Sequence, residues 1–302
     1  MHPGGEALES DAESDAAPDV GGRIEPDEFA DPAYPVTTPP DPVYPCQTRE
    51  PLASPLDGVA TPAMASRLVR PMDRALGRIW EGLGLLARHR PERQVSLHYG
   101  RIALNAHAWE RLRANLTGEP PDPALAGLPD TGFGRLPELW ESFRVRMRRG
   151  RLLARLQRAE DTGEALLADA IDGDWRDRAT AELSRGLLDE RAWVELLMPY
   201  FSLRMLGEEA FRADARVRAA IAFEQRCSAE IGRRLAADGV LYNPSDVAYL
   251  TVEERTRAVH DGTQYWMKVV SERVRRVEGF LDLEVPLRFW GSPRVEKEKP
   301  GG

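Results

Sequence analysis

The sequence predicts an all-α fold, a mainly helical bundle with one short β-hairpin, preceded by a disordered acidic tail. Three observations lead to this fold class. Apolar residues recur with a period of about 3.6 residues in most long segments, which is typical of helices. Strict alternation of apolar and polar residues, which is typical of strands, occurs around residues 95–104. Residues 1–57 instead show little periodicity and contain 11 of the 24 prolines.

The opening segment also differs from the rest of the chain in charge. Residues 1–57 hold 13 acidic and 2 basic residues, whereas the whole chain has a net charge of −8. Such a segment cannot bury enough apolar surface to offset the entropy of ordering. We therefore expect a disordered tail at residues 1–48, one folded domain at 49–291 and a second disordered tail at 292–302.

The first ordered elements are predicted to be two helices that flank the hairpin. Apolar residues at helical spacing cover residues 61–88, where Pro71 can kink the helix. The alternating segment at 95–104 then supplies the two strands of the hairpin. Asn105 is a favoured N-cap residue, so a second helix is expected to begin there and to extend to residue 116.

The middle of the chain is predicted to contain a loop and three further helices. Proline and glycine are frequent in residues 118–134, which indicates a loop. Apolar residues at helical spacing cover 136–160, 163–170 and 177–211, and Pro199 is expected to bend the last of these helices. Near Pro199 apolar residues lie nearly all round the helix, so we expect burial on several sides.

The last quarter predicts a long helix, a turn, a short helix and a final long helix. Gly239 is well placed to end the first of these helices. Pro244 breaks the chain next, because the residue before a proline avoids the α region. Thr251 and Glu254 fit a capping box, which starts the short helix. A final stripe of apolar residues at helical spacing covers 266–281.

Composition argues against several kinds of site. The two cysteines, Cys46 and Cys227, have no local partner, so we expect neither a disulfide framework nor a thiolate metal site. His89, His98 and His107 lie nine residues apart, but they fall in different predicted elements, so a shared metal is not expected. The acidic residues around 169–177 lack the glycine and the distal glutamate of a calcium loop, and helix capping explains them better.

The chain shows no sequence signal for a membrane. No apolar run approaches the roughly 18–20 residues that are needed to cross a bilayer. The acidic N-terminus also lacks the basic and apolar regions of a signal peptide. We therefore expect a cytoplasmic protein that does not act on membranes.

A run of arginines raises the question of nucleic-acid binding. Seven arginines with no acidic residue between them lie within residues 144–158. A nucleic-acid patch is one interpretation, but no aromatic residues are interleaved with the arginines. A solvated helix face or a dock for an acidic partner is therefore the preferred interpretation.

The last quarter also carries a recognisable motif. The pattern L…G…P-x-D-V-x-x-L-T-x-x-E fits Leu235, Gly239, Pro244-Ser-Asp-Val247 and Leu250-Thr-Val-Glu-Glu254, and P-x-R-F-x-G fits Pro286-Leu-Arg-Phe-Trp-Gly291. Looser matches are Pro51 to Leu56 and Gly100-Arg-Ile-Ala-Leu-Asn105, in which Ala103 stands in the place of an aromatic residue. Together these segments resemble the helical middle region of the phosphoenolpyruvate-utilising phosphotransferases, the family that contains phosphoenolpyruvate synthase and rifampin phosphotransferase.

The resemblance implies a division of labour between proteins. In this family an ATP-grasp region makes the phosphoryl donor, a swivelling histidine carries the phosphoryl group, and the middle region holds or faces the acceptor. This sequence shows neither an ATP-grasp pattern nor the S/T-H-x-A motif of the carrier histidine. The resemblance therefore implies a stand-alone subunit that binds or orients a small-molecule acceptor and binds no cofactor itself. Its partners would be separate ATP-grasp and phosphohistidine proteins, with ATP and Mg on a partner subunit.

The resemblance also implies one pair of site residues. Family members carry an R-E-x-P-K segment whose basic residues face the transferred phosphoryl group, and Arg212-Ala-Asp-Ala-Arg216 stands at roughly that place here. Arg212 and Arg216 are four residues apart, so they could clamp phosphate oxygens from one helical face. The alternative is a pair of exposed arginines at the start of a helix.

Two other interpretations of the whole chain stay open. One is a non-catalytic helical interaction protein that has kept the fold and lost phosphotransfer. The other is an unrelated helical enzyme whose site the sequence does not reveal. A pocket with an apolar wall and a few convergent polar groups would favour either the phosphotransferase subunit or the unrelated enzyme, whereas a filled core would favour the interaction protein.

Overall fold

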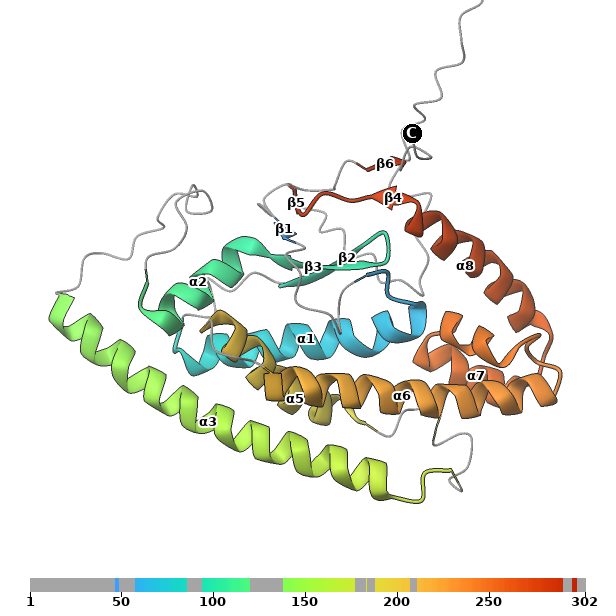
Figure 1. The fold of residues 1–302 in the computed structure, drawn as a ribbon, viewed down its shortest axis with the longest axis horizontal. Coiled ribbons are helices and arrows are strands. Elements are labelled where there is room, and N and C mark those ends of the chain that lie inside the picture. The colour runs from blue at the N-terminus through green and yellow to red at the C-terminus, as the bar shows by residue number, and fades with distance from the viewer. Residues whose placement is uncertain are drawn as a thin grey trace, which may run out of the picture. The chain divides into compact units, whose positions relative to one another are not determined.

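The computed structural model describes residues 47–48, 58–85, 94–119, 138–176, 183, 188–206, 211–289 and 295–297. All of these residues belong to one compact unit, Asp31–Gly302. This part of the chain is mainly helical, which confirms the predicted fold class (Figure 1). Its longer elements are helices α1 (Pro62–Gly82), α2 (Ala106–Thr117), α3 (Glu138–Asp172), α5 (Glu190–Met205), α6 (Phe211–Ala237), α7 (Val252–Asp261) and α8 (Tyr265–Leu281), together with the 3-10 helix η3 (Pro244–Tyr249).

Helix α5 packs against α1, α3 and α6. Its side chains are apolar nearly all round, and Trp193, Leu197, Tyr200 and Phe201 are fully buried. The expectation of burial on several sides of this segment is therefore confirmed. Burying each large side chain stabilises the fold by about 1.5–3 kcal/mol, so α5 supplies much of the core.

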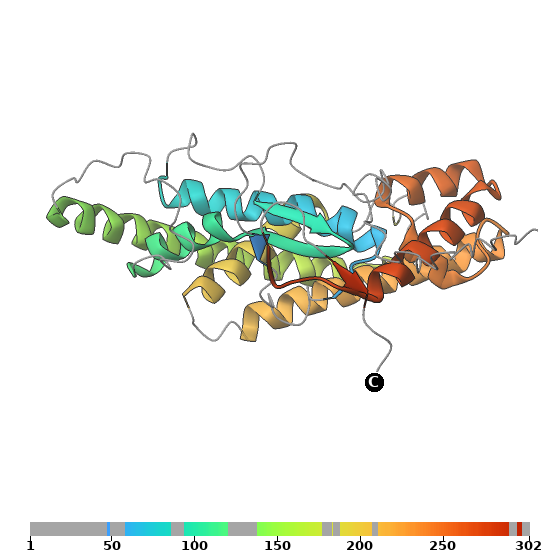
Figure 2. The same cartoon turned by 90° about the horizontal axis from the view of Figure 1, so that it is seen from above.

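The predicted hairpin is formed by β2 (Val95–His98) and β3 (Arg101–Asn105), and it packs against α1 through β2 (Figures 1 and 2). The strands are antiparallel, and their register places Val95 opposite Leu104 and His98 opposite Arg101. Tyr99 and Gly100 at the turn have φ angles of 48° and 70°. Two successive positive φ values are typical of a type I′ turn, which matches the twist of hairpin strands.

The sheet is larger than the single hairpin that the sequence predicted, so the prediction was wrong in the number of strands. Strand β1 (Gln47–Thr48) lies between β3 and β5 (Arg288–Phe289), which gives the order β2-β3-β1-β5. A second pair joins β4 (Leu283–Glu284) to β6 (Glu296–Lys297). Strands of two residues are held by backbone pairing with distant segments, so they leave no alternating pattern in the sequence.

Two of these short strands fall inside segments that were expected to be disordered tails. Gln47–Thr48 lies within the expected tail at 1–48, and Glu296–Lys297 lies within the expected tail at 292–302. Most other residues of both tails lie outside the described residues. At these two places the backbone pairs with other strands, β1 with β3 and β5 and β6 with β4, and the side-chain pattern of the sequence does not predict such pairing.

The predicted break near residue 162 is absent, because α3 is continuous from Glu138 to Asp172. Gly163, where a second helix was expected to begin, lies inside this continuous helix and allows a close approach between helices. A Cβ atom at Gly163 would lie 3.1 Å from Leu196 Cδ2 and 3.3 Å from the Glu195 backbone. The glycine therefore permits α3 and α5 to pack closely.

The predicted long helix at 177–211 was also wrong. Helix α5 begins after Asp189, whose carboxylate accepts a hydrogen bond from the Ala192 N–H at 2.7 Å, and it ends at Met205. In a continuous helix the Ala192 N–H would donate to a carbonyl of the preceding turn. Here it donates to the Asp189 side chain, which shows that a new helix begins at this place. The first helix also ends earlier than predicted, at Gly82 instead of residue 88.

Most other helix boundaries follow the predicted capping residues. Asn105 accepts a hydrogen bond from the Ala108 N–H at 3.0 Å and so begins α2. Thr251 and Glu254 form the predicted capping box of α7. Gly239 follows α6 with a φ of 72°, a left-handed conformation that glycine adopts without strain.

Candidate functional site

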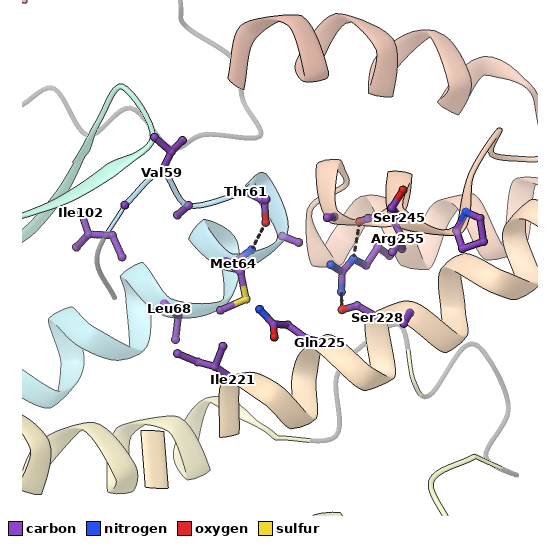
Figure 3. Close-up of a pocket in the computed structure, with 17 residues that line it drawn as sticks. Val59, Thr61, Met64, Leu68, Ile102, Ile221, Gln225, Ser228, Ser245 and Arg255 are labelled. Carbon is purple, nitrogen blue, oxygen red and sulfur yellow. Dashed lines mark hydrogen bonds between the residues drawn. The ribbon is translucent and has the colours of Figure 1, made fainter. Parts of the chain in front are cut away.

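A cavity of about 510 Å³ lies between the start of α1, the middle of α6, η3 and the first turn of α7 (Figure 3). Most of its wall is apolar, with side chains that include Val59, Met64, Leu68, Ile102, Ile221 and Val247. A few polar side chains reach the same space, namely Thr61, Gln225, Ser228, Ser245 and Arg255. This combination of an apolar wall and a few polar groups is typical of sites for small molecules.

The start of α1 forms one edge of the cavity. Thr61 is the N-cap, and its hydroxyl accepts a hydrogen bond from the Met64 N–H at 3.5 Å, while Pro62 begins the helix. The Ala60 N–H donates to the Gly100 carbonyl at 2.7 Å, which ties this edge to the hairpin turn. Because the helix starts at the cavity, the positive end of its dipole also lies there.

The short helix η3 forms the opposite wall, to which Pro244, Ser245 and Val247 contribute. Its first turn is closed by Asp246, whose carboxylate accepts a hydrogen bond from the Asn243 N–H at 3.0 Å. The wall lies very close to α6, since a Cβ atom on Gly232 would be 1.9 Å from the Pro244 carbonyl oxygen. The P-x-D-V segment singled out in the sequence thus forms one wall of the cavity.

Arg255 extends from α7 into this wall. Its side chain is buried, with a relative exposure of 3% for the residue. The Nε group donates to the Val247 carbonyl at 3.2 Å, and Nη1 donates to Ser228 Oγ at 2.8 Å. In Figure 3 the guanidinium points toward the space between Met64 and Gln225. The η3 backbone and α6 therefore hold Arg255 with its charged end at the cavity.

The guanidinium of Arg255 is charged although it is buried. Burial lowers the pKa of Arg255 to about 10, and the positive charge of Arg67 acts in the same direction, whereas the negative charge of Glu224 opposes the shift. A pKa near 10 still leaves the side chain protonated at neutral pH. A buried charge is costly unless other groups compensate for it.

The charges around Arg255 do not balance within the cluster. Glu224 lies beside Arg67, with 3.4 Å between Arg67 Nε and Glu224 Oε2, and both side chains are largely buried. Glu224 Oε1 accepts no hydrogen bond from a described residue. Among the residues that the structure describes, no carboxylate comes within ion-pair distance of Arg255. Two arginines and one glutamate leave one positive charge at the inner side of the cavity.

A second concavity of about 410 Å³ lies on α1, α3 and α5, and it is strongly polar. Its charged side chains are Arg78, Glu81, Arg155, Arg158, Arg191 and Glu195. Arg78 Nη1 lies 2.7 Å from Glu195 Oε1. Two members of the arginine run predicted from the sequence, Arg155 and Arg158, are therefore part of a basic, open surface.

The predicted pair Arg212 and Arg216 lies on α6, outside the lining of both concavities. Arg212 is exposed, whereas the Arg216 guanidinium forms ion pairs with Glu160 and Glu164 of α3. Burial lowers the pKa of Arg216, but the hydrogen bonds that its guanidinium donates to Glu160 and Glu164 raise the pKa overall. The structure thus places Arg216 between two carboxylates that join α6 to α3.

The histidines that the structure describes do not come together. His98 is buried in β2 with Nε2 3.1 Å from Ser96 Oγ, and burial lowers its pKa to about 4. His107 is half-buried on α2, and His260 is exposed on α7. No group of three or more potential metal ligands occurs within the described ranges.

Two further sequence predictions can be compared with the structure. Burial raises the pKa of Cys227 to about 12, so its thiol is neutral at pH 7 and a poor nucleophile.

Within the part of the chain that the structure describes, no helix combines the length and the apolar character required to cross a bilayer.

Sequence reasoning missed Arg255 and Ser228 as members of the cavity. A signal for Arg255 was present, because it stands three residues before Ala258 on the buried face of α7. A charged residue within an apolar stripe is unusual, since arginine is rarely buried without a partner. Ser228 gave no comparable signal, because serines are common on half-exposed helix faces.

The resemblance to the phosphotransferase family thus rests on sequence motifs, and the cavity is the physical feature from which a function can be argued. Compared with known proteins, the chain matches no protein-family model, no curated protein and no solved structure.

Proposed function

We propose that this chain is the acceptor-binding subunit of a split phosphotransferase similar to phosphoenolpyruvate synthase. The cavity of about 510 Å³ between α1, α6 and η3 carries the proposal. Its size falls in the range of small-molecule sites, and its wall includes Pro244, Ser245 and Val247 from the motif on which the resemblance rests. A filled core at this place would have favoured a purely structural role.

In this proposal the chain binds and orients the acceptor, and its partners supply the phosphoryl group. A separate ATP-grasp protein would use ATP and Mg to phosphorylate a histidine of a third protein. The P–N bond of that phosphohistidine would break as an oxygen of the acceptor forms a new P–O bond. A cavity that fixes the acceptor and excludes water would favour transfer over hydrolysis.

The proposal also needs a surface for the partners, and the basic concavity on α1, α3 and α5 is suited to an acidic protein. Arg155 and Arg191 form no ion pair with a carboxylate in the described part of the chain. The same surface favours the second candidate function, a non-catalytic interaction protein. The first candidate function places the protein in the cytoplasm, where its ATP-dependent partner would work.

Reconstitution tests the proposed function. Candidate ATP-grasp and phosphohistidine proteins encoded by neighbouring genes would be purified and mixed with this chain, radiolabelled ATP and a panel of hydroxyl and carboxylate acceptors. We expect a labelled acceptor when all three proteins are present. We expect the chain alone neither to hydrolyse ATP nor to become phosphorylated. A phosphohistidine on one of its own five histidines would contradict the proposal.

A cavity-filling variant provides a matched comparison. Ala229→Phe adds a large side chain to the cavity lining on α6, and it should abolish acceptor-dependent transfer. Ala222→Phe adds the same side chain to an exposed position of α6 outside the lining, and it should leave transfer unchanged. Equal transfer rates in the two variants would show that the acceptor does not bind in this cavity.

A further inference from the structure

The buried charge on Arg255 requires an explanation. The Arg255 guanidinium is held by a carbonyl and a hydroxyl, at 3.2 Å and 2.8 Å, and neither group carries a charge. The negative charge of Glu224 acts on Arg255 through space and is shared with Arg67. Removing a charged group from water costs several kcal/mol unless an opposite charge compensates. An anion in the cavity would supply the missing counter-charge.

Other features of the cavity also favour an anion at this end. The N-terminus of α1 contributes a positive dipole end, and its first turn, including Ala63 and Met64, lines the cavity. The side-chain groups of Ser228 and Gln225 lie on the α6 side of the same space (Figure 3). A planar guanidinium presents hydrogen-bond donors in the fork that a carboxylate accepts.

The charge count favours a single negative charge over two. Arg67, Arg255 and Glu224 together carry one net positive charge, which a carboxylate would neutralise. A phosphate dianion would leave one uncompensated negative charge in the same buried cluster. The remaining wall is apolar, through Val59, Leu68, Ile102 and Ile221, so the rest of the ligand must be apolar as well.

We propose that the cavity binds a small organic carboxylate with an apolar body, and that its carboxylate pairs with the Arg255 guanidinium while the body packs between α1, α6 and β3. The role of this ligand as phosphoryl acceptor rests on the proposed function. The binding of the carboxylate to this chain does not rest on the proposed function, because binding needs no partner protein.

Three probes with one apolar body and different head groups test the binding. The full chain would be titrated by calorimetry with 4-butylbenzoate, 4-butylbenzamide and 4-butylphenyl phosphate. We expect the carboxylate to bind at least tenfold more tightly than the neutral amide and also more tightly than the phosphate. Equal affinity for the carboxylate and the amide would overturn the pairing with Arg255 but would leave the cavity as a site for neutral acceptors.

Variants then assign the charge selectivity to Arg255. Arg255→Met should remove the preference for the carboxylate and leave the affinity for the amide, whereas Arg257→Met, on the exposed side of the same helix, should change neither. If Arg255→Met does not fold, the comparison of head groups on the unmodified chain still decides the question.

Two outcomes separate this inference from the proposed function. Absence of binding by all three probes would overturn the carboxylate site and would also remove the main support for an acceptor cavity. Selective carboxylate binding without any phosphoryl transfer in the reconstituted system would support the site and contradict the proposed function.

Discussion

Arg273 and Glu254 form a buried, two-pronged ion pair that joins α8 to the first turn of α7. Arg273 Nη1 lies 2.6 Å from Glu254 Oε2, and Nη2 lies 2.8 Å from Oε1. Arg273 Nη1 also donates to the Tyr249 carbonyl at 2.8 Å, and Glu254 Oε2 accepts from the Thr251 N–H at 2.9 Å. One ion pair therefore holds three consecutive elements, η3, α7 and α8, around the cavity wall.

The first prediction is that this pair is essential for stability. Arg273→Met leaves Glu254 buried without its counter-charge, so we expect the free energy of unfolding to fall by about 3–5 kcal/mol. The double variant Arg273→Met, Glu254→Gln should lose less than the sum of the two single variants, because the second change removes the stranded charge. Urea denaturation measures all three.

Arg275→Met, an exposed arginine on the same helix, is the control and should unfold like the parent chain. A loss below about 1 kcal/mol in Arg273→Met, the value of a surface pair, would show that the pair does not hold the wall.

The second prediction concerns pH and His98. Burial lowers the pKa of His98 to about 4, below the ordinary value of 6.5 that applies to the unfolded chain. The unfolded chain therefore binds a proton first as the pH falls, so the stabilisation is complete above about pH 6.5 and is lost toward pH 4. The contribution of His98 to the free energy of unfolding should fall by about 3 kcal/mol over this range, since each pKa unit corresponds to about 1.4 kcal/mol.

His98→Gln should flatten the dependence of the free energy of unfolding on pH between 4 and 6.5. His260→Gln, which changes an exposed histidine, should leave it unchanged. An NMR titration of the His98 ring that shows a midpoint near 6.5 would contradict the prediction.

The third prediction is that Gly232 cannot accept a side chain. Replacing a helical glycine with alanine ordinarily stabilises a protein by roughly 0.5–1 kcal/mol. At Gly232 the new Cβ would lie 1.9 Å from the Pro244 carbonyl oxygen and 2.8 Å from its carbon, so the backbone of η3 must move. We expect Gly232→Ala to lower the free energy of unfolding by about 1–3 kcal/mol, as overpacking does.

Gly279→Ala on α8 is the matched control, because no atom lies within 4 Å of the Cβ that it would add. It should stabilise the chain, and thermal unfolding of both variants measures the difference. Stabilisation by Gly232→Ala would mean that η3 is not seated on α6 as described.

The fourth prediction concerns the site residues expected from the sequence. Arg216→Ala removes the ion pairs to Glu160 and Glu164 and should lower the free energy of unfolding by about 1 kcal/mol, because the groups are partly exposed. Arg212→Ala changes an exposed side chain and should have little effect on stability. Denaturation measures both variants.

A role in phosphoryl transfer would give a different result. Loss of a well-placed donor to the phosphoryl group lowers turnover by about 100-fold. Single-turnover rates in the reconstituted system therefore test whether Arg216 acts on the phosphoryl group as well as on α3. Unchanged turnover in both variants would leave Arg216 with a structural role alone and would remove Arg212 from the site.

Local signals in the sequence predicted much of the fold. Capping residues such as Asn105, Thr251 and Glu254 act on backbone groups within three positions, so they mark helix ends wherever the chain folds. The predictions failed where distant segments decide the local structure. No break separates residues 160 and 163, where Gly163 lets α5 approach a continuous α3, and the partners of β1 and β5 lie far away in sequence.

In the candidate site, too, the features set by local sequence were predicted and those set by distant segments were not. The motif around Pro244 led to one wall of the cavity, because a proline after asparagine fixes a local turn. The importance of Arg255 depends on Ser228 and Glu224 from another helix and on the shape of the space between them, and no local pattern contains that information. For the same reason, the sequence around Arg212 and Arg216 did not indicate that Arg216 pairs with Glu160 and Glu164 of α3.

The pairing of β1 with β5 has a mechanical consequence. Gln47 lies opposite Phe289 and Thr48 opposite Arg288, so the chain enters β1 and leaves β5 at the same end of the ladder. A pulling force applied to these two points acts across the strands and opens the ladder one rung at a time, like a zipper, instead of shearing all rungs together. Under tension the β1–β5 pair should therefore separate at low force, before the buried helices α1 and α5 begin to separate.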